Sequence, residues 1–126
     1  MVSIRTDLRD PRLALYQNAL LTSERLSVYG WLRHGITGRI PDAEPAEANI
    51  GYSAPRDRDA AWAERQRWCL AARIDPQAMS TVHQVHGSDV VEVAFTESGR
   101  GGPLGSANLG QADALMTNAP GAAVMT

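Results

Sequence analysis

The chain has 126 residues, 44% hydrophobic and 21% charged, which predicts one soluble globular domain and excludes a disordered or fibrous chain. Its twelve basic residues are all arginine, and fourteen acidic residues bring the net charge to -2, so we expect no nucleic-acid partner. No apolar run approaches the roughly 18 residues of a membrane span, and charges interrupt the opening segment, so we expect a cytoplasmic protein with no membrane partner.

Two short strands are predicted near the start of the chain, over residues 13–16 and 26–29. A polar turn at residues 22–24 separates them, which is typical of an opening antiparallel pair. Residues 39–57 follow, with prolines at 41, 45 and 55 and a glycine at 51. This composition predicts a long irregular segment, and loops of this length are usually functional or disordered.

A helix is predicted from Ala60 to Ala72. Asp57 or Asp59 can cap its start, and Pro76 is expected to stop it. Apolar residues recur at helical spacing along one face: Ala61, Trp68, Cys69 and Ala72. Cys69 is the only cysteine of the chain, so it forms no internal disulfide, and its place in this apolar stretch predicts a core position.

The last third of the chain has the composition of strands separated by turns. Strands are predicted at residues 81–82, 90–93 and 114–117, and a glycine-rich turn region at residues 99–110. Residues 122–126 begin another apolar strand in which the chain ends. Because domains rarely end inside a buried strand, we expect an incomplete domain.

Two histidines lie three positions apart between the first two of these strands. At helical spacing His83 and His86 would share a face, but the flanking valines favour extended backbone, which points them to opposite sides. The residue pattern alone therefore places only one of them at a given site, and a structural, hydrogen-bonded histidine is the plainer interpretation of either.

A family resemblance covers about residues 28–126. Segment 81–91 (Thr-Val-His-Gln-Val-His-Gly-Ser-Asp-Val-Val) and segment 111–121 (Gln-Ala-Asp-Ala-Leu-Met-Thr-Asn-Ala-Pro-Gly) together resemble the laccase-like polyphenol oxidase family, whose members are regarded as purine nucleoside phosphorylases. Residues 33–35 (Arg-His-Gly) resemble the family's early Arg-x-Gly-Gly turn, and residues 49–51 (Asn-Ile-Gly) resemble its Asn-Leu-Gly.

The resemblance implies a fold and a reaction. The fold is α+β, a layered α/β sandwich with mixed β-sheets, of which residues 1–126 form the N-terminal portion of one domain, incomplete because the chain ends in mid-strand. The implied reaction is phosphorolysis of adenosine or inosine, with adenosine deamination beside it. A purine nucleoside and phosphate are the expected partners, and no oligomeric state is predicted.

The resemblance also implies a metal centre with His86 as its first ligand. The family's other two ligands are the cysteine of an Ala-Asp-Cys segment and the histidine of a His-Ala-Gly-Trp-Arg segment, and this sequence contains neither segment. Two imidazoles and a thiolate suit zinc and leave a fourth position open. Copper is the less expected metal, because such a set does not supply the several copper centres of phenol oxidation.

Four further residues are site candidates by the same resemblance. Arg33, Asn49 and Gln84 are expected to bind the substrate, and Asp113 to orient a metal ligand from behind it. Each has a plainer alternative. These are a turn contact or ion pair for Arg33, a loop-capping amide for Asn49, a strand hydrogen bond for Gln84, and for Asp113 hydrogen bonds with backbone N–H groups that pin the start of its strand.

Two other functions stay open at this point. Residues 32–37 (Leu-Arg-His-Gly-Ile-Thr) resemble the Arg-His-Gly-x-Thr motif of histidine phosphatases, in which the residue matching His34 would be the nucleophile. Alternatively, the polypeptide is a non-catalytic fragment or an interaction module whose open strand edge pairs with another chain.

Overall fold

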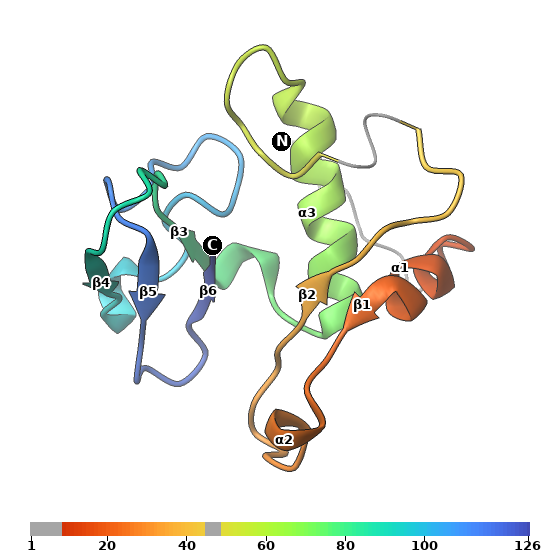
Figure 1. Cartoon of the computed structure of the whole chain (residues 1–126), viewed down its shortest axis with the longest axis horizontal. Coiled ribbons are helices and arrows are strands. Elements are labelled where there is room, and N and C mark those ends of the chain that lie inside the picture. The colour runs from red at the N-terminus through yellow and green to blue at the C-terminus, as the bar shows by residue number, and fades with distance from the viewer. Residues whose placement is uncertain (1–8, 45–48) are drawn as a thin grey trace. The chain divides into compact units, whose positions relative to one another are not determined.

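A computed structural model describes residues 9–44 and 49–126 of the chain (Figure 1). Residues 1–8 and 45–48, including the charged opening segment and Pro45, lie outside the described residues. The chain divides into two compact units, one ending at Ile74 and one running from Asp75 to Thr126, and each is described by itself. Helices and small sheets are both present, so the fold is α+β as predicted.

The longest element of the first unit is the helix α3, Arg58–Ala72. Its start is capped by Asp57, whose carboxylate accepts the N–H of Ala60 at 3.1 Å. Its end is set by Arg73, whose left-handed backbone turns the chain away before Pro76 is reached. The prediction of this helix and of its Asp57 cap is therefore confirmed.

The helix α1, Leu13–Ala19, occupies the residues for which we predicted the first strand. That prediction was wrong, because a run of four apolar residues does not distinguish a short strand from one face of a helix. Only Tyr16 of this helix is buried. Its ring meets that of Trp68 from α3 edge to face, with the centroids 4.9 Å apart.

The second predicted strand is also wrong, because residues 24–27 form the short helix α2, Glu24–Ser27. Ser23, from the predicted polar turn, caps it by accepting the N–H of Leu26. An antiparallel pair does exist here, but it joins β1, Leu20–Leu21, to β2, Ile36–Thr37.

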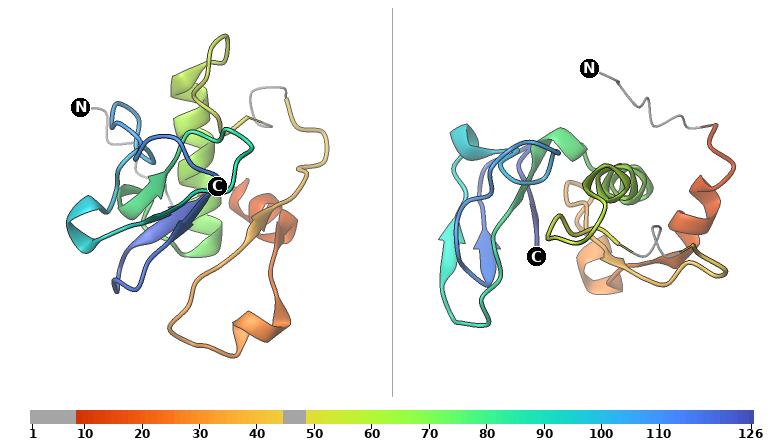
Figure 2. Two further views of the ribbon diagram at one scale, coloured as in Figure 1. Left: turned by 60° about the vertical axis from the view of Figure 1, so that its left-hand side comes forward. Right: turned by 90° about the horizontal axis from the view of Figure 1, so that it is seen from above.

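The core of the first unit is formed by Tyr16, Ile40 and Trp68. Partly buried apolar residues pack around it: Ala19, Leu20, Ala43, Ile50 and Ala71. Cys69 is buried in α3, as predicted, and the right-hand view of Figure 2 looks almost along this helix. Residues 39–44 and 49–57 contain neither helix nor strand, which confirms the irregular segment for its described part.

The second unit contains two parallel strand pairs. The strand β3, Met79–Thr81, pairs with β6, Ala123–Met125, and β4, Val90–Glu92, pairs with β5, Ala114–Met116. These pairs confirm the four strands predicted in this part of the chain. Two single turns of 3-10 helix, Pro76–Ala78 and Phe95–Glu97, precede β3 and follow β4.

The glycine-rich region between β4 and β5 is irregular, as predicted. In it Gly99, Gly101, Gly105 and Gly110 all have positive φ. None of the helices in residues 9–44 and 49–126 combines the length and the apolar run of a membrane-spanning segment.

Candidate functional site

The segment Gln-Val-His-Gly forms a tight turn between β3 and β4. At its centre His86 has a φ of 58°, which places this residue in the left-handed region. A non-glycine residue rarely adopts this conformation unless its surroundings stabilise it. The side chain of His86 is exposed. The turn therefore presents an imidazole to solvent, and its left-handed backbone requires stabilising contacts from other residues.

That support comes from the carboxylate of Asp113. Its Oδ1 accepts the backbone N–H groups of Val85 at 3.0 Å and His86 at 2.7 Å, and its Oδ2 accepts the N–H of Gly87. Three successive N–H groups converging on one anion form the concave arrangement called a nest. A side chain 27 residues away from His86 thus stabilises the histidine turn.

Backbone hydrogen bonds bring the two segments together. The N–H of His83 donates to the carbonyl of Gly110 at 2.7 Å, and the N–H of Ala112 donates to the carbonyl of His83 at 3.1 Å. Beyond the turn, the N–H of Asp113 donates to the carbonyl of Asp89 at 3.1 Å. The chain then continues into β5, which lies beside its partner β4 in Figure 1.

The nest also changes the acidity of Asp113. Desolvation acts to raise the pKa of this carboxyl, but the hydrogen bonds from Gly87, His86 and Val85 outweigh it, and the pKa lies below its ordinary value. The positive charge that His86 can carry acts in the same direction. Asp113 is therefore held as a carboxylate acceptor.

Gly87 lets the carboxylate come close. A Cβ added at this position would lie 3.2 Å from Oδ2 of Asp113 and 3.9 Å from a methyl group of Val85. The first distance is tighter than ordinary van der Waals contact, so a larger residue here would push on the carboxylate.

The other candidate residues make local contacts. Arg33 is exposed, and one of its guanidinium nitrogens donates to the carbonyl of Gly30 at 3.1 Å, the turn contact considered above. The side-chain amide of Asn49 both donates to the carbonyl of Gly51 and accepts its N–H, each at 3.1 Å, which is a loop-capping arrangement. Gln84 is exposed beside the histidine turn.

His34 is engaged with the backbone of Ser23. The N–H of Ser23 donates to Nε2 of His34 at 2.9 Å, and the carbonyl of Ser23 lies 3.2 Å from the same nitrogen. When it accepts the N–H, Nε2 has its lone pair occupied, so it is a poor nucleophile. The ring ties the loop before α2 to the approach to β2.

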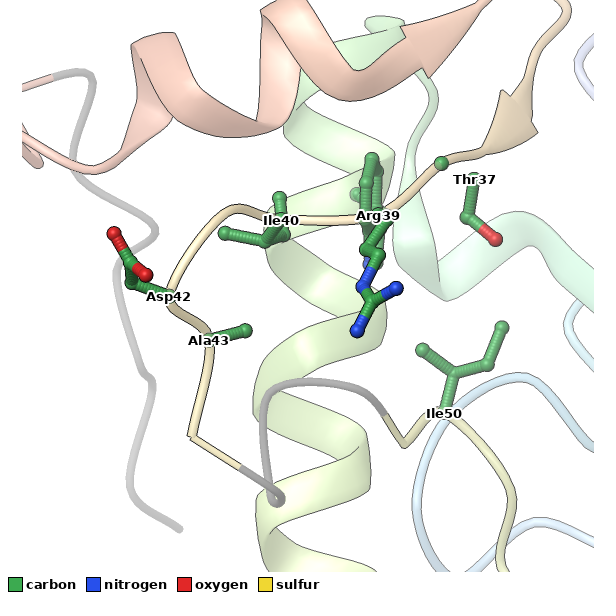
Figure 3. Close-up of a pocket in the computed structure, with 8 residues that line it drawn as sticks. Thr37, Arg39, Ile40, Asp42, Ala43 and Ile50 are labelled. Atoms are coloured by element: carbon green, nitrogen blue, oxygen red, sulfur yellow. The ribbon is translucent and has the colours of Figure 1, made fainter.

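A pocket of about 620 Å³ lies in the first unit, next to its core. It is lined by Thr37, Gly38, Arg39, Ile40, Asp42, Ala43, Ile50 and Trp68. Figure 3 shows the guanidinium of Arg39 extending between Ala43 and Ile50, whereas the carboxylate of Asp42 points away. None of the five candidate site residues is among its lining residues. The sequence around Arg39 contains no motif that would have identified it as a pocket residue.

A known protein family matches the larger part of the chain. The model described as multi-copper polyphenol oxidoreductase laccase matches residues 33–126. The chain belongs to this family. No curated protein and no solved structure matches the chain. The resemblance seen in the two paired segments is thereby confirmed, and both segments lie inside the matched region.

Membership of the laccase family raises the question of a metal, because the family's description names copper. Within residues 9–44 and 49–126, no three His, Cys, Asp or Glu side chains are grouped so that they could hold a metal ion. Cys69 is buried in α3 of the first unit. His86 can supply one ligand, and the described residues do not complete a centre around it.

Laccase-family membership also bears on the phosphatase interpretation of residues 32–37. The family match accounts for 33–126, including the paired segments that the phosphatase interpretation leaves unexplained. Together with the occupied Nε2 of His34, this removes the ground for assigning a phosphoryl-accepting nucleophile there.

Proposed function

We propose that this laccase-family chain belongs to a purine nucleoside phosphorylase that cleaves adenosine or inosine with phosphate and also deaminates adenosine. His86 is in this proposal one ligand of a zinc ion. The observation that supports it is the exposed imidazole of His86 on a turn clamped by the carboxylate of Asp113.

The chemistry of the turn fits a metal ligand. Within the described residues neither ring nitrogen of His86 has a hydrogen-bond partner, so either can bind a metal. Imidazole nitrogen is a common zinc ligand, and a bound zinc ion supplies Lewis-acid polarisation of the substrate. The described residues group no second and third ligand with His86, so the proposal requires two ligands from outside them.

Arg33, Asn49 and Gln84 are the proposed substrate-binding residues. A guanidinium carries five N–H donors, and the contact with Gly30 uses one of them, so Arg33 keeps the capacity to bind phosphate. Asn49 contributes by shaping the loop at Gly51, since both ends of its amide are engaged there. Gln84, next to the histidine turn, is suited to a polar group of the nucleoside.

The test uses the polypeptide expressed from its whole gene, loaded with zinc. Phosphate-dependent release of hypoxanthine from inosine, with ribose 1-phosphate as the second product, is expected. His86→Ala should lower kcat/KM at least about 100-fold, whereas the neighbouring His83→Ala should stay within a few-fold. Base release without phosphate dependence, or copper-dependent oxidation of phenols alone, would contradict the proposal. A cytoplasmic location belongs to the same proposal and is checked by cell fractionation.

An interaction module is the second candidate, favoured by a specific surface of the first unit. Large apolar side chains are exposed in residues 28–36, with Val28 75%, Trp31 80% and Ile36 70% accessible. Surfaces of this kind mark binding sites for other polypeptides. If the chain is an interaction module, Trp31→Ser abolishes association with a partner polypeptide and His86→Ala leaves this association unchanged. A loss of nucleoside cleavage in His86→Ala is expected only of the phosphorylase, which distinguishes the two candidates.

A further inference from the structure

We infer that Asp113 is a positioning residue, whose carboxylate holds the backbone of residues 85–87 in the one conformation that presents His86 for metal binding. The metal-binding part of this inference rests on the proposed function. The hold on the turn stands on the geometry alone.

The backbone conformation of His86 is unfavourable unless neighbouring groups stabilise it. A left-handed conformation is unfavourable for a non-glycine residue, because its Cβ comes too close to the following carbonyl oxygen. His86 has this conformation at a φ of 58°. Without compensation, the turn would relax to an ordinary conformation and point the imidazole elsewhere. Something specific must therefore stabilise the turn.

The carboxylate of Asp113 compensates for this unfavourable backbone conformation. Hydrogen bonds to an ionised acceptor are stronger than neutral ones. Asp113 accepts three of them, from Val85, His86 and Gly87 in succession. All three donors are backbone groups, so Asp113 controls where the main chain of His86 lies and leaves the ring nitrogens to other partners.

Asp113 is itself held in place by its backbone. Its N–H donates to the carbonyl of Asp89, and its chain continues directly into β5, which is paired with β4. The carboxylate therefore projects from a sheet edge of defined register. A glutamate would place the carboxylate one methylene further out, so that it could not keep the hydrogen bonds of 3.0 and 2.7 Å to the N–H groups of Val85 and His86.

The two segments of the family signature depend on each other. Gln-Val-His-Gly supplies the imidazole and the nest, and Ala-Asp-Ala supplies the anion that fills the nest. Neither segment holds the histidine in place by itself. Their pairing through His83, Gly110 and Ala112 brings the anion to the nest.

The experiment uses the polypeptide expressed from its whole gene, as in the activity test, with Zn²⁺ alone as the metal probe. Amide hydrogen exchange is measured by NMR at Val85, His86 and Gly87, and Zn²⁺ is titrated against the ring signals of His86. Asp113→Asn should speed exchange at the three amides at least about 10-fold and weaken Zn²⁺ binding at His86 by about 10- to 100-fold. Asp113→Glu should not restore either property.

Asp89→Asn is the matched control, because Asp89 is an exposed carboxylate of the same loop that contributes to these bonds only through its backbone carbonyl. It should leave exchange and Zn²⁺ binding as in the wild type. Gly87→Ala is the second variant in case Asp113→Asn does not fold. It keeps the carboxylate but crowds its Oδ2, and it should change both measurements in the same direction by a smaller amount.

The outcomes separate this inference from the proposed function. Unchanged exchange at the three amides in Asp113→Asn overturns the inference, and so does faster exchange with Zn²⁺ binding at His86 unaltered. If the wild-type ring of His86 does not respond to Zn²⁺, the proposed ligand role fails. The exchange measurement then decides by itself whether Asp113 holds the turn.

Discussion

The phenolic hydroxyl of Tyr16 donates to the carboxylate of Glu64, and the two side chains are 0% and 2% exposed. The other oxygen of this carboxylate pairs with Arg67, which also lies 3.7 Å from a carboxylate oxygen of Asp10. A buried carboxylate is costly unless it is paired and hydrogen-bonded. In the first unit, the Tyr16 hydroxyl from α1 and the Arg67 guanidinium therefore each provide a hydrogen bond to one oxygen of the Glu64 carboxylate.

We expect Tyr16→Phe to lower the free energy of unfolding by about 1–3 kcal/mol, because it removes a donor and leaves part of a buried carboxylate unsatisfied. Denaturant unfolding followed by tryptophan fluorescence measures this change. Tyr29→Phe is the control, since Tyr29 is 49% exposed and its hydroxyl removal should change stability by less than about 0.5 kcal/mol. Equal effects of the two variants would rule out a special role for the pair of Tyr16 and Glu64.

Arg65 gives a second prediction, because its guanidinium serves two contacts at once. Nε donates to the carbonyl of Ile50 at 2.6 Å, and the guanidinium carbon lies 3.8 Å from the centre of the Tyr52 ring. A lysine has the charge but neither the planar face nor the same donor geometry. We expect Arg65→Lys to destabilise the chain by about 1–2 kcal/mol, measured by denaturant unfolding.

Arg58→Lys is the control for this prediction. Arg58 is exposed, and its guanidinium carbon lies 5.7 Å from the same ring, so the substitution should cost less than about 0.5 kcal/mol. A loss in Arg58→Lys as large as that in Arg65→Lys would mean that stacking on Tyr52 is not what distinguishes the two arginines.

The elements that could be predicted from the sequence are those with a local cause. The helix α3 has a capping aspartate and an apolar face, and the strands β3, β4 and β6 of the second unit contain β-branched residues. The prediction for the residues of α1 was wrong because a short apolar run suits a strand as well as a helix, although leucine and alanine favour the helix. What decides between the two is the packing of Tyr16 against Trp68, which lies 52 positions away and leaves no local signal.

The candidate site shows the same limit. The family resemblance named His86 and Asp113 as residues of one site, and both lie in the matched region. The left-handed backbone of His86 and the three bonds to Asp113 depend on the parallel pairing of segments about 27 residues apart. Spacing along a sequence carries no information about such a register.

The pKa of Asp113 leads to a third prediction, on pH. A carboxyl whose pKa is lowered by folding contributes stability above its unfolded pKa, and this contribution is lost as the pH falls through its folded pKa. Since the pKa of Asp113 lies below the ordinary value of 3.8, the amide signals of residues 85–87 should titrate together with a midpoint below 3.8. A common midpoint at or above 3.8, measured by NMR, would contradict the nest. Asp113→Asn should abolish this titration.

The glycines of the second unit give the last prediction, because two of them share a backbone conformation but differ in the space around them. Gly101 and Gly105 have φ values of 88° and 85°, so alanine would be strained at both, by about 1–2 kcal/mol. At Gly105 an added Cβ would meet nothing within 4 Å. At Gly101 it would lie 2.7 Å from the Cα of Asn108 and collide with the hydroxyl of Thr81.

We therefore expect Gly105→Ala to lose about 1–2 kcal/mol of unfolding free energy and Gly101→Ala about 3–4 kcal/mol, the difference being the overpacking. Thermal and denaturant unfolding of the two variants measure it. Because Thr81 ends β3, the excess in Gly101→Ala should appear with faster amide exchange along the β3–β6 pair, while Gly105→Ala leaves that exchange unchanged. Equal losses in both variants would show that conformational strain alone, and not the close approach to Asn108 and Thr81, requires glycine at position 101.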